Sequence, residues 1–265
     1  MSWEFHPREF TFSAWGSLAL HDWADAAYRA GSDNDVYSLV MRQGGALGFA
    51  DFGAAASSRP VWNLAEGADC WSTGLTPPEV FWLKLQVDNA SRVVPLQSAG
   101  LVLQRAIDRI GVLTLDTLDL MTPLRPVRES PMDLAYGRDW YEFGDPAARR
   151  RASIDLVLND RTTTEALLAE KTGPWLGDCL TFLEPATEPV SQPAARPVRL
   201  SGSRLIPDGT EATYHFEVVL GSDTLDFLAW VAETFVWALG DGPGESLVLR
   251  VSVDRGNPPA GPLHS

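Results

Sequence analysis

Apolar residues recur at alternate positions in several short segments, which is the pattern of a half-buried β-strand. In the segment 247–253 one face carries Leu247, Leu249, Val251 and Val253, and the other carries Val248, Arg250 and Ser252. The pattern predicts strands at 9–15, 36–42, 47–52, 80–87 and 112–120, and again at 153–158, 179–184, 198–205, 213–220 and 247–253. Helices are predicted between them, among others at 22–30, 162–171 and 225–239.

The predicted elements occur in one order twice: strand, helix, three strands, helix, strand. The strands that begin at Phe81 and Tyr214 are separated by nearly the same number of residues as those that begin at Leu113 and Leu247. With one additional strand in each half, this is the ferredoxin-like order. The sequence therefore predicts an α+β protein of two tandem ferredoxin-like (βαβββαβ) halves, with mainly antiparallel sheets and helices on one face.

The halves are predicted at 1–122 and 152–255, joined by an aromatic-containing linker at 123–151 and followed by a flexible tail at 256–265. Thr162 and Glu165 have the spacing of a capping box at the start of a helix, and Gly173 is predicted to end that helix. The stretch 53–78 is predicted to be a long, ordered loop that is either a lid over the polar face of the sheet or a plug for an open barrel end.

One face of each predicted sheet is expected to carry the core. This set should face the helices and be buried: Phe81, Leu83, Leu85, Tyr214, Phe216, Val218, Leu249 and Val251. The opposite face is polar and includes His215 and Glu217 on one strand, Trp82 and Lys84 on the aligned strand, and Arg250 on the last strand.

This polar face has three interpretations. It is a solvated surface, an interface between the halves or, if the two sheets face each other, the lining of a cleft in which His215 or Glu217 acts as a general base opposite Lys84. These three residues are therefore the catalytic candidates, and Arg250 and Trp82 are candidates for binding.

The predicted helix 225–239 is apolar on nearly all sides, whereas a helix covered on one side only has polar residues on the other. Its Phe227, Trp230 and Trp237 side is therefore expected to contact the other half of the chain, a second copy or a target protein. These three residues are candidates for a binding surface.

The chain has 265 residues, a net charge of −14 and a pI near 4.6. This charge disfavours a nucleic-acid-binding surface, which needs clustered Lys and Arg. No apolar segment is long enough to span a membrane, and no signal segment is found, so a cytoplasmic location is predicted. The bias toward Arg, Ala, Gly and Pro is typical of a bacterial protein from a high-GC genome.

Recognisable catalytic, nucleotide-binding and metal-binding motifs are lacking. The four histidines are scattered, and the two cysteines are expected to be buried free thiols. No metal and no cofactor are predicted. The composition thus favours a cytoplasmic, non-catalytic binding or accessory protein that acts through a protein partner or self-association. The alternative is a cofactor-independent enzyme that acts on a small molecule in a cleft between the two sheets.

Overall fold

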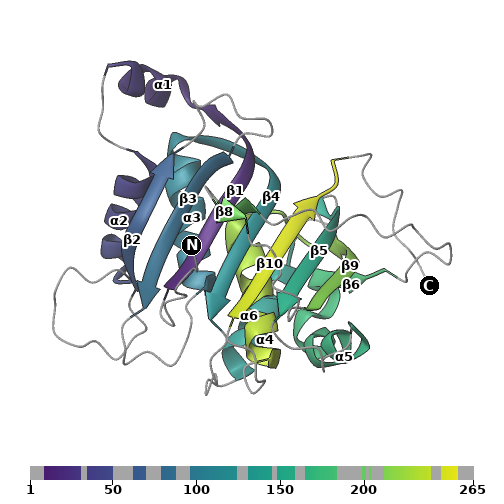
Figure 1. Ribbon diagram of the computed structural model, residues 1–265. Helices are drawn as coiled ribbons and strands as arrows, with labels where there is room; N and C mark the ends of the chain where they lie inside the picture. The colour runs from purple at the N-terminus through teal and green to yellow at the C-terminus, as the bar shows by residue number, and fades with distance from the viewer. Residues whose placement is uncertain are drawn as a thin grey trace.

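The computed structural model describes residues 9–30, 35–49, 62–69, 79–87, 96–123, 131–144, 148–158, 165–183, 199–200, 203–204, 212–239 and 246–255. These residues form a mixed α/β structure with one large antiparallel sheet and six α-helices (Figure 1).

The sheet has eight strands, and every neighbouring pair is antiparallel. Its order is β2 (Trp62–Asp69), β3 (Glu79–Val87), β1 (Glu9–Leu20), β4 (Gly111–Pro123), β10 (Ser246–Val253), β5 (Arg150–Leu158), β9 (Ala212–Leu220) and β6 (Leu180–Phe182). The strands β1, β2 and β3 lie on the β4 side of the β4–β10 pair, and β5, β6 and β9 lie on the β10 side. Two short strands, β7 (Arg199–Leu200) and β8 (Ser203–Arg204), form a separate hairpin.

The helices are α1 (Asp22–Arg29), α2 (Val36–Leu47), α3 (Leu96–Ile110), α4 (Pro131–Glu142), α5 (Glu165–Leu176) and α6 (Leu225–Leu239). A short 3₁₀ helix, η2 (Gly177–Cys179), follows α5. Helices α3 and α6 lie side by side behind the centre of the sheet, and α1 lies apart at one end (Figure 1). The central strands therefore have a helix-covered face and an opposite face, which is turned to the viewer.

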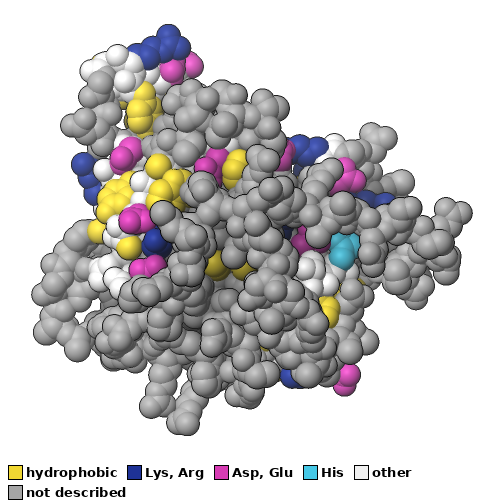
Figure 2. Space-filling model, in the orientation of Figure 1, with side chains coloured by type: hydrophobic (Ala, Val, Ile, Leu, Met, Phe, Trp, Pro, Cys, Tyr) yellow, Lys and Arg dark blue, Asp and Glu magenta, His cyan; other side chains and the backbone are white. Residues whose placement is uncertain are grey.

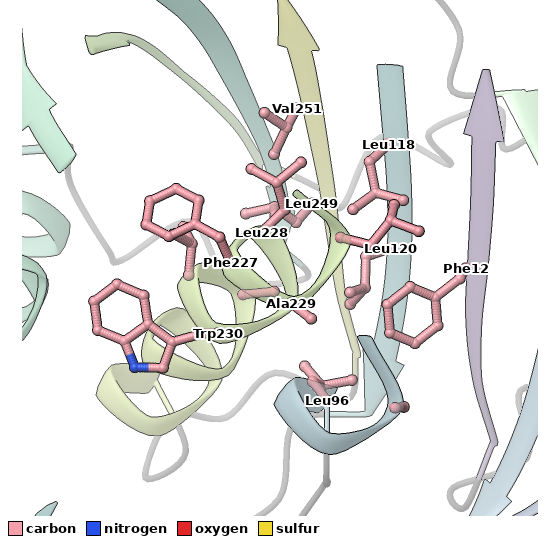
Figure 3. Packing of buried hydrophobic residues seen from close by; sticks show 14 of the residues in the cluster. Phe12, Leu96, Leu118, Leu120, Phe227, Leu228, Ala229, Trp230, Leu249 and Val251 are labelled. Atoms are coloured by element: carbon pink, nitrogen blue, oxygen red, sulfur yellow. The ribbon is translucent and has the colours of Figure 1, made fainter. Parts of the chain in front are cut away.

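Helix α6 is buried over most of its surface, with only Asp226, Glu233, Trp237 and Ala238 half-buried. Leu228 lies toward Leu249 of the sheet, whereas Phe227 and Trp230 point away from the strands (Figure 3). Phe227 and Trp230 are both 0% exposed. Their cover comes from α4, whose Tyr141 ring lies 5.1 Å from Phe227 and 5.2 Å from Trp230, measured between ring centroids.

The predicted core is confirmed. Of the eight residues expected to face the helices, six are fully buried, and Tyr214 and Phe216 are 7% exposed. The strand register explains this result, because Leu249 is paired with Leu120 on one side and Leu156 on the other. Because side chains alternate between the two faces of a strand, the apolar side chains of every central strand then lie on the face covered by the helices.

The strands predicted at 36–42 and 47–52 are wrong over the described residues, because 36–47 is the helix α2. Val36, Val40 and Gly44 are its buried residues, at helical spacing. The Asp35 side chain caps the helix by accepting a hydrogen bond from the Ser38 N–H at 2.7 Å. The helix ends at Gly48, whose φ of 73° is a left-handed conformation that favours glycine.

Three further expectations need correction. Gly173 does not end a helix but lies inside α5, which continues to Leu176. The stretch 53–78, predicted as a loop, contains the edge strand β2, and the linker 123–151 contains α4. Thr162 and the tail 256–265 lie outside the described residues.

The contact of α4 with α6 yields a test, because Gly137 of α4 lies directly against the Trp230 indole. A Cβ added at Gly137 would overlap that ring, whereas a Cβ at Gly173 of α5 would meet nothing within 4 Å. Gly137→Ala should therefore lower the free energy of unfolding by about 1–3 kcal/mol through overpacking. Gly173→Ala should change it by less than about 1 kcal/mol, since the better helix propensity of alanine is opposed by Pro174, which disfavours a helical residue with a Cβ before it.

Urea unfolding of the two variants measures both effects. Equal free energies of unfolding for Gly137→Ala and Gly173→Ala would contradict the close approach of α4 to α6.

Candidate functional site

A row of paired residues crosses the face of the sheet opposite the helices, and it contains three of the candidates from the sequence, Trp82, Arg250 and His215. From β3 to β9 the row is Trp82, Ser13, Asp119, Arg250, Asp155 and His215. Charged side chains of both signs are visible on this face (Figure 2). The row includes Asp119–Arg250, which joins the two parts of the sheet, and His215, which lies near the β6 edge.

Asp119 of β4 and Arg250 of β10 form a bidentate ion pair. The Arg250 Nε and Nη2 atoms donate to the two carboxylate oxygens at 2.6 and 2.7 Å. The Asp119 side chain is 0% exposed and that of Arg250 is 12% exposed. Burial raises the pKa of Asp119 above its ordinary value of 3.8, and the hydrogen bond and charge of Arg250 oppose this shift.

The second cluster is half-exposed and centres on His215. Its Nδ1 lies 2.7 Å from Asp155 Oδ1, and its Nε2 lies 3.0 Å from Glu217 Oε1. Asp155 lies between His215 and Arg250, since its β5 position pairs with both. Acidic and basic side chains thus alternate along Asp119, Arg250, Asp155, His215 and Glu217.

Lys84 is on the same face as His215 and Glu217 but not close to them. Four strands, β1, β4, β10 and β5, separate β3 from β9. At a strand spacing of 4.7–4.9 Å, this places the backbones of Lys84 and His215 about 24 Å apart. Lys84 instead pairs with Glu66 at 3.1 Å and Glu9 at 3.7 Å.

This arrangement corrects the geometry of the proposed cleft. The cleft required two sheets that face each other, but β4 pairs with β10, so the halves share one sheet edge to edge. Glu217 and Lys84 consequently cannot act on one small molecule from opposite walls. Trp82 is half-buried on β3 and lies in the row beside Ser13 rather than near Arg250.

The three aromatic candidates of α6 lie inside the chain. Phe227 and Trp230 are covered by Tyr141, and Trp237 is half-buried with its ring 4.8 Å from that of Trp175 on α5. The contact beyond their own strands, which the sequence predicts, is therefore made by helices of the same chain.

Helix α4 instead exposes aromatic residues that the sequence places in the linker. Tyr136, Trp140 and Phe143 are 63, 73 and 95% exposed. Tyr136 and Trp140 are helical residues at i and i+4, and Phe143 follows directly after the last helical residue, at i+7. The spacing predicts one face for all three. This signal is present in the sequence, but it has meaning only once 131–142 is known to be helical.

Cys179 is a buried free thiol, as expected, while Cys70 lies outside the described residues. Burial raises the pKa of Cys179 to about 11, and nearby Glu142 adds to the shift. The thiol donates to the Arg138 carbonyl at 3.4 Å. Since the thiolate is the nucleophilic form, Cys179 is poorly suited to covalent chemistry at neutral pH.

Within the described ranges, no group of three His, Cys, Asp or Glu side chains could hold a metal ion. A helix with the length and apolar character needed to cross a membrane is likewise not found there. In comparisons of the chain with protein families, with curated proteins and with solved structures, no match was found. Functional interpretation therefore depends on the contacts and exposures of the chain's own residues.

The buried ion pair between Asp119 of β4 and Arg250 of β10 can be tested through its effect on stability. Arg250→Met should lower the free energy of unfolding by about 3–5 kcal/mol, because it leaves the Asp119 carboxylate buried without its cation. The double variant Asp119→Leu/Arg250→Met should regain most of this loss, since it leaves no buried charge unpaired.

Urea unfolding at neutral pH measures both variants. A loss below ~1 kcal/mol in the single variant, or no recovery in the double variant, would mean that the pair contributes little at this join.

Proposed function

We propose that the chain is a non-catalytic, cytoplasmic binding protein, and that its contact surface is the outer face of α4. The observation that carries this proposal is the aromatic stripe of Tyr136, Trp140 and Phe143, which is largely exposed. Large apolar side chains that gather on one exposed face typically mark a site of contact. Anchors at i, i+4 and i+7 are the pattern by which one helix face enters a groove of another protein.

The inner side of α4 is held firmly, which supports a role for the outer side. The Tyr141 hydroxyl donates to Asp226 at 3.1 Å, and an Arg138 N–H donates to the Pro174 carbonyl at 3.3 Å. Gly137 brings the helix close to Trp230. A fixed helix loses less conformational entropy when a partner binds, so its aromatic residues can contribute more to affinity.

The charge of the chain favours a basic partner protein. Asp139 and Glu142 border the aromatic stripe on one side and share a single cation, Arg138, at 3.1 and 3.9 Å, and the whole chain has a net charge of −14. A second copy would bring the same acidic border against itself, and an anionic membrane surface would repel the chain. A different protein that has an apolar groove with a basic rim could bind the aromatic rings in the groove and the acidic side chains at the rim.

The experiment replaces Trp140 with p-benzoylphenylalanine and irradiates cells of the source organism that express the full-length chain. Each captured protein is then purified and titrated by calorimetry against the wild-type chain and against Trp140→Ser. A ring at the centre of such a contact contributes about 2 kcal/mol or more, so Trp140→Ser should weaken binding roughly 30-fold.

The matched control is Trp23→Ser, because Trp23 is 56% exposed on the distant helix α1. Trp23→Ser should bind as the wild type does, and the unfolding of both variants should be unchanged within about 0.5 kcal/mol. Light scattering should give a monomer for the free chain. Capture of nothing but a second copy, or equal affinities for Trp140→Ser and Trp23→Ser, would contradict the proposal.

We also infer that the two groups of strands are tandem ferredoxin-like halves. Support comes from their order in the sheet: β4, β1, β3, β2 in one group and β10, β5, β9, β6 in the other. When the four strands of each group are numbered along the chain, both groups have the spatial order fourth, first, third and second. Helix α2 takes the place of α5, and α3 that of α6. The hairpin β7–β8 is additional to the second group.

A cofactor-independent enzyme is the second candidate, and the hydrogen bond between Asp155 and His215 favours it. A carboxylate on one ring nitrogen orients an imidazole for acid–base work at the other nitrogen. That other nitrogen, Nε2, is engaged by Glu217, so a substrate would have to displace a carboxylate. A fragment screen monitored by the NMR signals of the His215 ring should find a ligand there if this candidate holds, and no shifted signal would count against it.

A further inference from the structure

Both nitrogens of the His215 ring contact carboxylate oxygens, Asp155 Oδ1 through Nδ1 and Glu217 Oε1 through Nε2. An ionised carboxylate only accepts hydrogen bonds, and a neutral imidazole has one N–H to donate. A neutral ring could therefore satisfy one carboxylate, and its lone pair would face the other. Only the imidazolium ion donates to both.

The charges around the ring favour the same ion. Asp155 on β5 and Glu217 on His215's own strand are the two acids that contact it. Arg250 of β10 lies beyond Asp155, and Asp119 of β4 lies beyond Arg250. On the β6 side, among the described residues, Thr181 pairs with Val219 and adds no charge. With a cationic His215, the row and Glu217 together have two cations and three anions, whereas with a neutral ring three anions share one cation.

We propose that His215 is a pH-sensitive clamp that ties the side chains of β9 to β5 while its ring is protonated. Loss of the proton releases one of the two carboxylates and leaves Asp155 and Glu217 as like charges on either side of a neutral ring. Asp155 then interacts mainly with Arg250, and the outer part of the sheet loosens at β9. The ring is half-exposed, so solvent protons reach it without prior unfolding.

The direction of the response follows from the pKa of His215. Partial burial alone would lower this pKa, but the hydrogen bonds and charges of Asp155 and Glu217 outweigh burial and raise it above 6.5. Because this pKa is higher in the folded state than in the unfolded state, the clamp stabilises the folded chain fully at pH values below the unfolded-state pKa. The contribution of the clamp to stability is lost as the pH rises through the folded-state pKa. The clamp therefore opens on the alkaline side.

The test is an NMR titration of the full chain with ¹⁵N-labelled histidine from pH 5 to pH 9. At pH 6 both ring nitrogens of His215 should be protonated, and the titration midpoint should lie above that of the same residue in the urea-unfolded chain. Asp155→Asn and Glu217→Gln should each lower the midpoint. Glu217 is 55% exposed, so Glu217→Gln tests the clamp even if Asp155→Asn impairs folding.

Hydrogen exchange of the β9 amides reports the structural consequence. In the wild type, the free energy of local opening derived from exchange at β9 should fall as the pH rises through the His215 midpoint. In His215→Gln this step should be missing, and His21→Gln should retain it, because His21 lies near α1 with its Nε2 3.2 Å from the Asp108 carbonyl. A neutral His215 ring at pH 6, a midpoint at or below the unfolded value, or an unchanged β9 opening energy across the titration would each overturn the proposal.

Discussion

The burial of α6 is the constraint on which the rest of the structure depends. An apolar helix of this length has to be covered on every side, and no single neighbour can do this. The sheet covers it through Leu228, α3 approaches it at Gly100 and Ala229, α4 covers Trp230, and α5 covers Trp237. Strands of the sheet and three other helices therefore meet around one helix. The position of α4, and with it the exposed stripe of aromatic residues, is a consequence of this packing.

Much of this architecture could be predicted from the sequence where the pattern of apolar residues is regular and long. The strand at 80–87 alternates regularly and the helix at 225–239 is a long apolar segment between turn residues, and both occur as predicted. The segment 36–47 was ambiguous, because Val36, Tyr37 and Val40 are good strand residues and Gly44-Gly45 resembles a turn. Val36, Val40 and Gly44 also fit a helix, and tertiary packing on α3 and β2 favours that alternative.

The site was less predictable than the fold, because strand neighbours far apart in the sequence determine it. His215 and Glu217 could be placed on one face from their spacing alone. That Asp119 binds Arg250 depends on the pairing of β4 with β10, which no local pattern encodes. The same pairing separates Lys84 from His215. The aromatic stripe on α4 was not predicted, for a related reason. Its aromatic residues can be read from the sequence, but only the helical conformation of α4 places them on one face.

Joining the two halves through β4 and β10 has a consequence for the chain's behaviour at high concentration. Two separate four-stranded sheets would have four open edges, each with unpaired backbone groups that can recruit another chain. The fused sheet has two. At one of them β2 has a register shift between Leu64 and Glu66, and at the other β6 has only three residues. The register shift discourages the addition of a foreign strand at β2, whereas β6 pairs with β9 only from Val218 to Leu220, so the joined sheet restricts this route to aggregation at its β2 edge.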